Sequence, residues 1–231
     1  MSRHEMRKLK SVNASMGVMM EILSRRLGDK DGPHHKAPSK WPKVRMKTLE
    51  LAGQLKIPFT TGILIGIGET REERIHSLLA ILASHRQYQH VHDVIIQNFR
   101  AQPNTEMANR ANASTLDLLW TVSVARLILG AAANIQVPPN LNSSDYTSFL
   151  SAGINDWGGV SPLTIDYVNP DAPWPDLEQL RHRTAKAGFR LRPRLPIYPE
   201  YFLQASDYLP KPLRERALAL SDAEGYVKGT T

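Results

Sequence analysis

The segment from Gly62 to Glu69 is the first stretch of the sequence that could bind a ligand. Gly66 and Gly68 stand where an apolar strand would pass into a helix, so backbone there could approach a bound molecule closely. A dinucleotide-binding fingerprint needs a third glycine, but Arg71 takes that position, and no Lys-Ser or Lys-Thr pair follows as in a Walker loop. Two interpretations stay open: contact with polar or anionic ligand groups at the helix N-terminus, or a purely structural turn.

Polar residues and glycines also follow three later apolar segments. They are Gln97, Asn98, Asn140, Asp156, Gly158 and Gly159. In a βα barrel, the carboxyl ends of the strands face the active site. We therefore predict a ligand site on the rim formed by these strand ends.

The histidines and cysteines limit the metal chemistry of the chain. His34 and His35, and likewise His85, His90 and His92, lie close in sequence, but no acidic residue is spaced with them in a known metal pattern. We expect these histidines to be solvated. The sequence has no cysteine, which excludes disulfides, thiolate nucleophiles and cysteine ligands to zinc or iron in this chain.

Five strand-like segments alternate with helical patterns. The segments cover 12–16, 57–68, 91–99, 133–137 and 154–160. Helices are expected from Pro42, from the capping box that begins at Thr70, and from the N-cap Ser114. The helix after Thr70 should bury one stripe of apolar residues: Ile75, Leu78, Leu79 and Leu82.

This alternation predicts an α/β fold with a parallel sheet, either a partial TIM-type barrel or a doubly wound sheet. After about residue 170 the rhythm fades and prolines become frequent, with one helix expected over 176–187. We therefore divide the chain into a partial barrel, 1–170, and a C-terminal extension, 171–231, packed on it.

Composition narrows the class of protein. The net charge is +7 over 231 residues, and 42% of the residues are hydrophobic, as in ordinary globular proteins. The basic residues are dispersed, which disfavours nucleic-acid binding. The sequence contains no apolar run of membrane-spanning length and starts with no signal-peptide core, so we expect a cytoplasmic protein without membrane contact.

Several motifs, read together in order, resemble a known family. They are Val12-Asn-Ala-Ser-Met-Gly-Val-Met-Met-Glu21, Thr61-Gly-Ile-Leu-Ile-Gly-Ile-Gly-Glu-Thr70, Val94-Ile-Ile-Gln-Asn-Phe-Arg-Ala101, Asn134-Ile-Gln-Val-Pro-Pro-Asn-Leu141 and Asp156-Trp-Gly-Gly-Val-Ser-Pro162. They resemble the ring-closing radical S-adenosylmethionine enzymes of the 7,8-didemethyl-8-hydroxy-5-deazariboflavin (FO) synthase family. The resemblance covers nearly the whole chain.

The resemblance implies a fold, a reaction and its cofactors. The fold would be the last five units of a radical S-adenosylmethionine barrel. In the family, a 4Fe–4S cluster cleaves S-adenosylmethionine to a 5′-deoxyadenosyl radical. The radical attacks an adduct of tyrosine-derived and ribityl-diaminouracil parts, made by a partner enzyme, and the deazaflavin ring closes with loss of ammonia. Such an enzyme is a carbon–nitrogen lyase that acts on a small-molecule substrate.

The resemblance also implies site residues. Gly66, Gly68 and Glu69 would lie against the adenosine, and Gln97 and Asn98 near the adenine. The ribose and methionine would meet Asn13, Ser15 and Glu21. The substrate would meet Asn140, Asp156, Gly158 and Gly159.

The sequence departs from the family in one large respect. The family's cluster loop is Cys-x3-Cys-x2-Cys, and this chain has no cysteine. The chain starts where the family is about to enter its fourth strand, so we expect a truncated protein whose first three units are absent or supplied by another polypeptide, such as an N-terminal half or a partner FO synthase subunit. We predict that the chain alone is inactive; the alternative is a non-catalytic remnant that binds S-adenosylmethionine or a deazaflavin precursor. Segments 12–16 and 154–160 should then be the open edges of the sheet.

Overall fold

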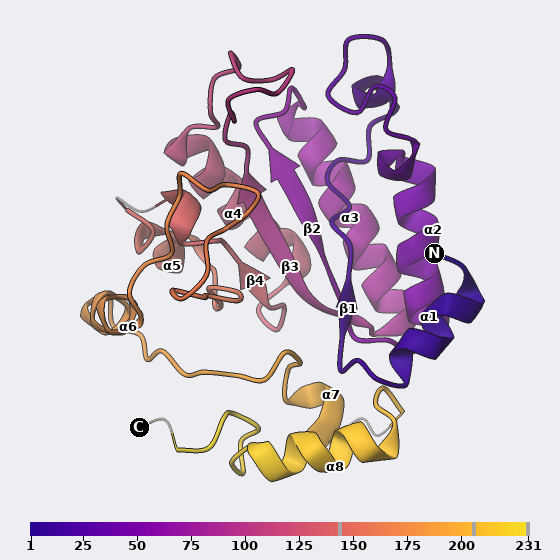
Figure 1. The fold of residues 1–231 in the computed structure, drawn as a ribbon, viewed down its shortest axis with the longest axis vertical. Helices are drawn as coiled ribbons and strands as arrows, with labels where there is room; N and C mark the ends of the chain where they lie inside the picture. The colour runs from indigo at the N-terminus through magenta and orange to yellow at the C-terminus, as the bar shows by residue number, and fades with distance from the viewer. Residues whose placement is uncertain (143–144, 205–206, 230–231) are drawn as a thin grey trace.

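One parallel sheet organises the fold. The computed structural model describes residues 1–142, 145–204 and 207–229, and its four strands have the order β1-β2-β3-β4 (Figure 1). They are β1 (Met16–Gly17), β2 (Phe59–Ile65), β3 (Val91–Asn98) and β4 (Ile135–Gln136). Strands that are neighbours in sequence are neighbours in the sheet, as in a barrel. In a doubly wound sheet the order of the strands reverses part of the way along the chain. The fold is therefore α/β with the arrangement of a partial TIM-type barrel.

A fifth position extends the sheet beyond β4. Asp156 forms an isolated parallel bridge with Gln136, and the backbone N–H of Asn155 donates to the Ile135 carbonyl at 3.1 Å. Five parallel positions match the five predicted units. The predicted first strand, 12–16, is wrong over most of its length, because pairing begins at Met16 and Val12 is 70% exposed. Within the described part of the chain, no further strand pairs with the outer side of β1 or of Asp156.

Eight α-helices and three short 3₁₀ helices accompany the strands in the described residues. The α-helices are α1 (Arg3–Lys10), α2 (Pro42–Gln54), α3 (Arg71–Tyr88), α4 (Thr115–Leu129), α5 (Ser148–Ala152), α6 (Leu177–Lys186), α7 (Glu200–Leu203) and α8 (Lys211–Leu220). The 3₁₀ helices are η1 (Arg25–Gly28), η2 (Pro38–Lys40) and η3 (Asn140–Asn142). The crossover helix α3 packs on β2 and β3, and α4 packs on β3 and β4. None of the described helices combines the length and the hydropathy needed to cross a membrane.

The helix starts agree with the sequence, but the buried face of α3 does not. The Glu73 N–H donates to Thr70 Oγ1 at 3.2 Å and the Thr70 N–H donates to Glu73 Oε2 at 2.7 Å, which completes the predicted capping box. The predicted apolar stripe is correct for Leu78, which is fully buried, but wrong for Leu79, which is 45% exposed, while Ile75 and Leu82 are half-buried. The residues that the helix buries are Arg74, Ser77, Leu78, Ile81 and Ser84. Arg74 is buried because it pairs with Glu69, and Ser77 because its Oγ accepts from the Leu23 N–H.

Two apolar clusters hold the molecule together. The larger cluster lies between the sheet and its helices and includes Ile63, Ile65 and Ile96, which are fully buried. The smaller one joins α7 and α8 around Phe202. Figure 1 shows α7 and α8 beyond the amino ends of β2 and β3, opposite the strand tips. Leu180 of α6 lies beyond residue 170 and belongs to the larger cluster, so the two predicted parts of the chain share a core. The division at residue 170 stays a prediction.

Candidate functional site at the strand ends

The loop between β2 and α3 needs its two glycines. Gly66 and Gly68 have φ angles of +91° and +107°, which side chains rarely tolerate. A Cβ on Gly66 would lie 2.7 Å from the Cβ of Ala113, and one on Gly68 would overlap the Arg110 guanidinium. Backbone conformation and packing thus account for both glycines without a ligand.

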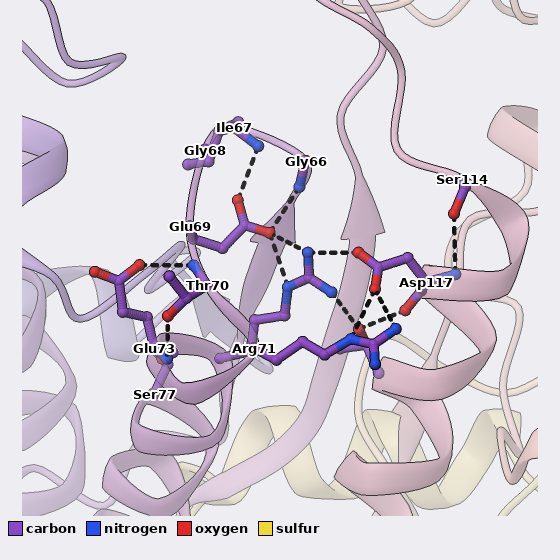
Figure 2. Close-up of polar contacts among 12 residues, drawn as sticks. Gly66, Ile67, Gly68, Glu69, Thr70, Arg71, Glu73, Ser77, Ser114 and Asp117 are labelled. Carbon is purple, nitrogen blue, oxygen red and sulfur yellow. Dashed lines mark hydrogen bonds and ion pairs between the residues drawn. The ribbon is translucent and has the colours of Figure 1, made fainter.

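Glu69 fills the inside of this loop. Its Oε1 accepts from the Gly66 N–H at 2.8 Å and its Oε2 accepts from the Ile67 N–H at 2.9 Å (Figure 2). The guanidinium of Arg74 reaches the same carboxylate, with Nη2 2.6 Å from Oε1. The Glu69 side chain is 0% exposed. Glu69 therefore positions the loop, and its oxygens are already occupied by protein donors.

Arg74 extends this contact to α4. Its Nη2 lies 2.6 Å from Asp117 Oδ2, and its Nη1 donates to Thr121 Oγ1 at 3.0 Å. The hydrogen bond from Arg74 is the largest influence on Asp117 and lowers the pKa of that carboxyl. A chain of alternating charges, buried at Glu69 and Arg74 and half-buried at Asp117, thus ties the glycine loop to two helices.

The N-terminus of α3 is already neutralised by side chains. The Glu73 carboxylate of its capping box also forms an ion pair with Arg26, with Nη2 2.6 Å from Oε2, and accepts from Ser24. The hydrogen bond from Arg26 is the main reason why the pKa of Glu73 falls to about 2. Because Glu69 and Glu73 take the donors that an anion would need, this end of α3 is not built as a phosphate site.

Glu21 follows β1 and is the anchor for the segment that carries η1 and η2. Its backbone N–H donates to the Gly62 carbonyl at 3.0 Å, and it has a φ of 62°. Its carboxylate lies 2.6 Å from His34 Nε2, 3.1 Å from Lys40 Nζ and 3.6 Å from Arg45 Nη2. Burial opposes ionisation, but the hydrogen bonds from His34 and Lys40 outweigh it and lower the pKa of Glu21.

Gln97 and Asn98 end β3 beside the end of β2. The register places Gln97 next to Leu64, and Asn98 next to Ile65. Gln97 is half-buried, whereas Asn98 is 5% exposed and its Oδ1 accepts from Asn142 Nδ2 at 3.0 Å. Gln97, unlike Asn98, thus remains partly accessible at the rim.

Asn140 begins η3 and is buried. Its Nδ2 donates to Asp166 Oδ2 at 3.0 Å and to the Ala172 carbonyl at 3.2 Å. Its Oδ1 is buried and has no partner among the described residues. Asn140 joins the rim to the segment that follows the fifth sheet position, and it retains one acceptor.

Asp156 lies deeper than a rim residue. It pairs with Gln136, which is level with Ile95 in the middle of β3. Its Oδ2 accepts from Arg194 Nε and from the Tyr198 hydroxyl, both at 2.5 Å. Gly158 donates its N–H to Asp156 Oδ1 at 2.5 Å, while Gly159 faces open space. Arg194 and Tyr198 of the C-terminal segment therefore reach into the interior side of the sheet and donate hydrogen bonds to the Asp156 carboxylate.

Asp93 shares this interior network. Its carboxylate accepts from Gln136 Nε2, and its Oδ2 lies 3.6 Å from Arg194 Nη2. Burial is the dominant effect and raises the pKa of Asp93 to about 6. Sequence reasoning missed Asp93, Arg194 and Tyr198, because no local pattern signals contacts between the strands and the extension.

Asn13 and Ser15 lie away from this rim. Asn13 Nδ2 donates to the Leu9 carbonyl at the end of α1, and Ser15 Oγ donates to the Pro196 carbonyl at 2.5 Å. Both residues precede β1, level with the amino end of β2, about 20 Å along the strand from Gly66. The structure therefore brings Glu21, Gly66 and Gln97 toward the carboxyl ends of the strands and leaves Asn13 and Ser15 near the amino ends.

The expectation of solvated histidines is wrong for three of the five. His34, His90 and His92 are 3%, 0% and 3% exposed. His34 is the partner of Glu21, and His90 Nε2 lies 3.0 Å from the Leu49 carbonyl. Among the described residues, no group of three or more side chains is arranged to hold a metal ion.

Comparison with known proteins identifies relatives over nearly the whole chain. No family model matches the sequence. It is 53% identical over 227 residues to the 7,8-didemethyl-8-hydroxy-5-deazariboflavin synthase of Methanopyrus kandleri, covering 98% of this chain and 67% of that protein. It is 50% identical to the synthase of the same name from Methanococcus maripaludis, covering 88% of this chain and 61% of that protein. It is 49% identical to the FO synthase of Streptomyces avermitilis, covering 96% of this chain and 26% of that protein.

The chain thus spans two thirds or less of the length of these curated relatives. A sequence identity of about one half over nearly the whole length of the chain shows which family the chain belongs to. The chain belongs to the 7,8-didemethyl-8-hydroxy-5-deazariboflavin synthase family.

Proposed function

We propose that this chain acts in deazaflavin biosynthesis as the part of an FO synthase that holds S-adenosylmethionine and the substrate during ring closure. The observation that carries this proposal is the 53% identity to a named synthase over 98% of the chain. The reaction would be the radical carbon–nitrogen lyase chemistry that the sequence resemblance implies.

A 4Fe–4S cluster does not fit this chain. Such a cluster is held by cysteine thiolates, and the 231 residues include none. We therefore assign no step of the reaction to a cluster here. In our proposal the thiolates come from another polypeptide segment, either an N-terminal part or a partner FO synthase subunit, and the chain alone does not cleave S-adenosylmethionine.

The strand-end rim suits the adenosine part of S-adenosylmethionine better than a phosphate ligand. Glu69 already accepts the N–H groups of the glycine loop, and Glu73 neutralises the start of α3. Gln97 is half-buried, and its side-chain amide offers a donor and an acceptor for hydrogen bonds with an uncharged base. We assign adenosine contact to Gly66, Gly68 and Gln97, with Glu69 and Asn98 holding the backbone around them.

The charged cluster around Glu21 suits the amino-acid end of S-adenosylmethionine. That end carries both an ammonium and a carboxylate group, and Glu21 with Lys40 and Arg45 offers both signs of charge. On the substrate side we assign Asn140, whose Oδ1 has no partner among the described residues, and Gly159, which faces open space. Asp156 and Gly158 would line the part of the pocket that lies deeper in the sheet than the rim.

Equilibrium dialysis with S-adenosylmethionine tests this assignment. We expect weak binding, with a dissociation constant above micromolar, and at least a tenfold loss in Gly66→Ala, whose Cβ would collide with Ala113. Gly188→Ala is the matched control, because Gly188 has a φ of +86° but nothing within 4 Å of its Cβ position. Unchanged binding in Gly66→Ala, or submicromolar affinity of the unaltered chain, would contradict the proposal.

The absence of cysteine favours a second candidate function, that of a non-catalytic protein that binds S-adenosylmethionine or a deazaflavin precursor. Both functions predict binding at the rim. They differ in whether the chain supports catalysis once the rest of a synthase supplies the thiolates.

A further inference from the structure

The loop of residues 161–168 turns a cluster of apolar side chains to the outside of the molecule. Four of them are exposed over more than half of their surface: Leu163 at 96%, Ile165 at 58%, Tyr167 at 85% and Val168 at 72%. Among the described residues, no other stretch of eight holds more than one large apolar side chain exposed to that degree. Single exposed apolar side chains are ordinary, whereas a cluster marks a contact surface.

The polar groups of this loop point inward and hold it in that orientation. Asp166 Oδ1 accepts from the backbone N–H of Val168 at 2.9 Å and from that of Asn169 at 3.2 Å. Asp166 Oδ2 accepts from Asn140 Nδ2 at 3.0 Å, and Asn140 is 1% exposed. The loop thus reverses the usual arrangement, with its carboxylate bound inside and its apolar side chains outside.

The loop follows directly on an open edge of the sheet. Asp156 is the outermost sheet position and is bridged to Gln136 on one side, and no strand in the described part of the chain pairs with its other side. A Cβ on Gly159 would meet nothing within 4 Å. The open edge and the exposed apolar side chains therefore belong to one uninterrupted stretch, residues 156–168.

The order of the strands indicates what this stretch would contact. All the strands are parallel and follow one another in chain order, so a further unit of the same kind would add beside Asp156 or, at the opposite edge, beside β1. Further strands that join the two edges close such a sheet into a barrel, which has no open edge. The chain covers 67% of the Methanopyrus kandleri synthase, so about a third of that protein has no counterpart here.

We propose that residues 161–168 are a docking surface for the part of an FO synthase that this chain does not match. That part would place a parallel strand beside Asp156 and cover Leu163 and Tyr167 with apolar side chains of its own. Asp166 is the only charged residue of the loop and its carboxylate is bound inside, so the surface suits an uncharged, apolar partner face. This assignment rests on the proposed function and gives its missing segment a place on the chain.

Thiol labelling tests the docking, because the chain has no cysteine and one introduced thiol reports on one position. Leu163→Cys is made in the full chain and in a single-chain fusion of this protein with the unmatched part of the Methanopyrus kandleri synthase. Mass spectrometry of the tryptic peptide measures alkylation at that site. We expect alkylation to be at least tenfold slower in the fusion than in the chain at its lowest usable concentration. Leu127→Cys, at a position of α4 that is 82% exposed, is the matched control and should react equally fast in both.

A second set of variants tests whether the apolar contact causes the protection. Tyr167→Cys should be protected in the fusion in the same way. Addition of Leu163→Glu should speed its alkylation at least tenfold, whereas addition of Leu127→Glu should leave it unchanged. Equal alkylation of Leu163→Cys in fusion and chain, or equal protection of Leu127→Cys, would overturn the proposal.

The remaining outcomes separate the docking from its alternatives. Protection in the chain alone that rises with concentration, and that the fusion does not exceed, would show that a second copy covers the loop and would overturn the proposal. Deazaflavin formed by a fusion whose loop stays reactive would also overturn it, while the proposed function would stand. A protected loop in a folded fusion that forms no product would support the docking and contradict the proposed function.

Discussion

Removal of one partner of the buried pair Glu69–Arg74 should destabilise the chain more than removal of one partner of an exposed ion pair. The Glu69 and Arg74 side chains are 0% and 5% exposed, and Glu69 also accepts two loop N–H groups. Glu69→Gln places an amide NH₂ against these donors and leaves the Arg74 charge with Asp117 alone. Removal of one partner of a buried, hydrogen-bonded pair costs about 3–5 kcal/mol, so we expect a loss of that size in the free energy of unfolding.

Equilibrium unfolding in urea of Glu69→Gln, Arg74→Met and the double variant measures this pair. We expect each single change to cost about 3–5 kcal/mol, and the double change to cost less than the sum by at least about 1 kcal/mol, because it leaves no uncompensated charge behind. Glu215→Gln is the control, since the exposed Lys211–Glu215 pair at 3.9 Å should contribute less than about 0.5 kcal/mol. A loss below about 1 kcal/mol in Glu69→Gln, or full additivity, would refute the assigned role of Glu69.

Three further predictions concern the interior network, the Glu21 cluster and the exposed surface. Because burial raises the pKa of Asp93 from 3.8 to about 6, its contribution to stability is present below pH 3.8 and is lost as pH rises through 6. The stability of Asp93→Asn relative to the unaltered chain should therefore rise by about 2 kcal/mol between pH 4 and 7, and a flat difference in urea unfolding would contradict this. Glu21→Gln should speed tryptic cleavage between residues 24 and 40, which Glu21 anchors through His34 and Lys40, and cleavage as slow as in the exposed control Glu50→Gln would contradict the anchoring. Leu163 and Tyr167 are 96% and 85% exposed, so we expect the chain, with its open sheet edges, to self-associate in size-exclusion chromatography and Leu163→Glu to reduce this; a monodisperse monomer that melts above ~60 °C would show the partial barrel to be self-sufficient.

Local signals in the sequence predicted the elements that local interactions determine. The capping box at Thr70, the N-cap at Ser114 and the proline at the start of α2 all lie where expected, because each depends on residues within one helical turn. The five parallel positions follow from the alternation of apolar segments and helices. The predicted stripe on α3 failed because Arg74 and Ser77 are buried by polar contacts with Glu69 and Leu23, which no apolar period can reveal.

The site was harder to predict because its contacts join distant residues. Glu69 was predicted beside a cofactor, but its orientation depends on the positive φ of Gly66 and on Arg74, so it faces the loop. Asp156 and Arg194 are 38 residues apart, and nothing near either one signals their contact. Asn13 and Ser15 were expected to meet the ribose and methionine, but pairing of β1 begins only at Met16, which leaves them near the amino ends of the strands.

The most direct test of the proposed function is a single-chain fusion of this protein with the part of the Methanopyrus kandleri synthase that it does not match. After anaerobic iron and sulfide reconstitution, the fusion receives S-adenosylmethionine, a reductant and the tyrosine–diaminouracil adduct, and 5′-deoxyadenosine and the fluorescent deazaflavin are measured by chromatography. We predict both products from the fusion, neither from this chain alone, and loss of both in the fusion carrying Gly66→Ala. A folded, cluster-loaded fusion that forms neither product, or 5′-deoxyadenosine formed by the chain alone, would contradict the proposal.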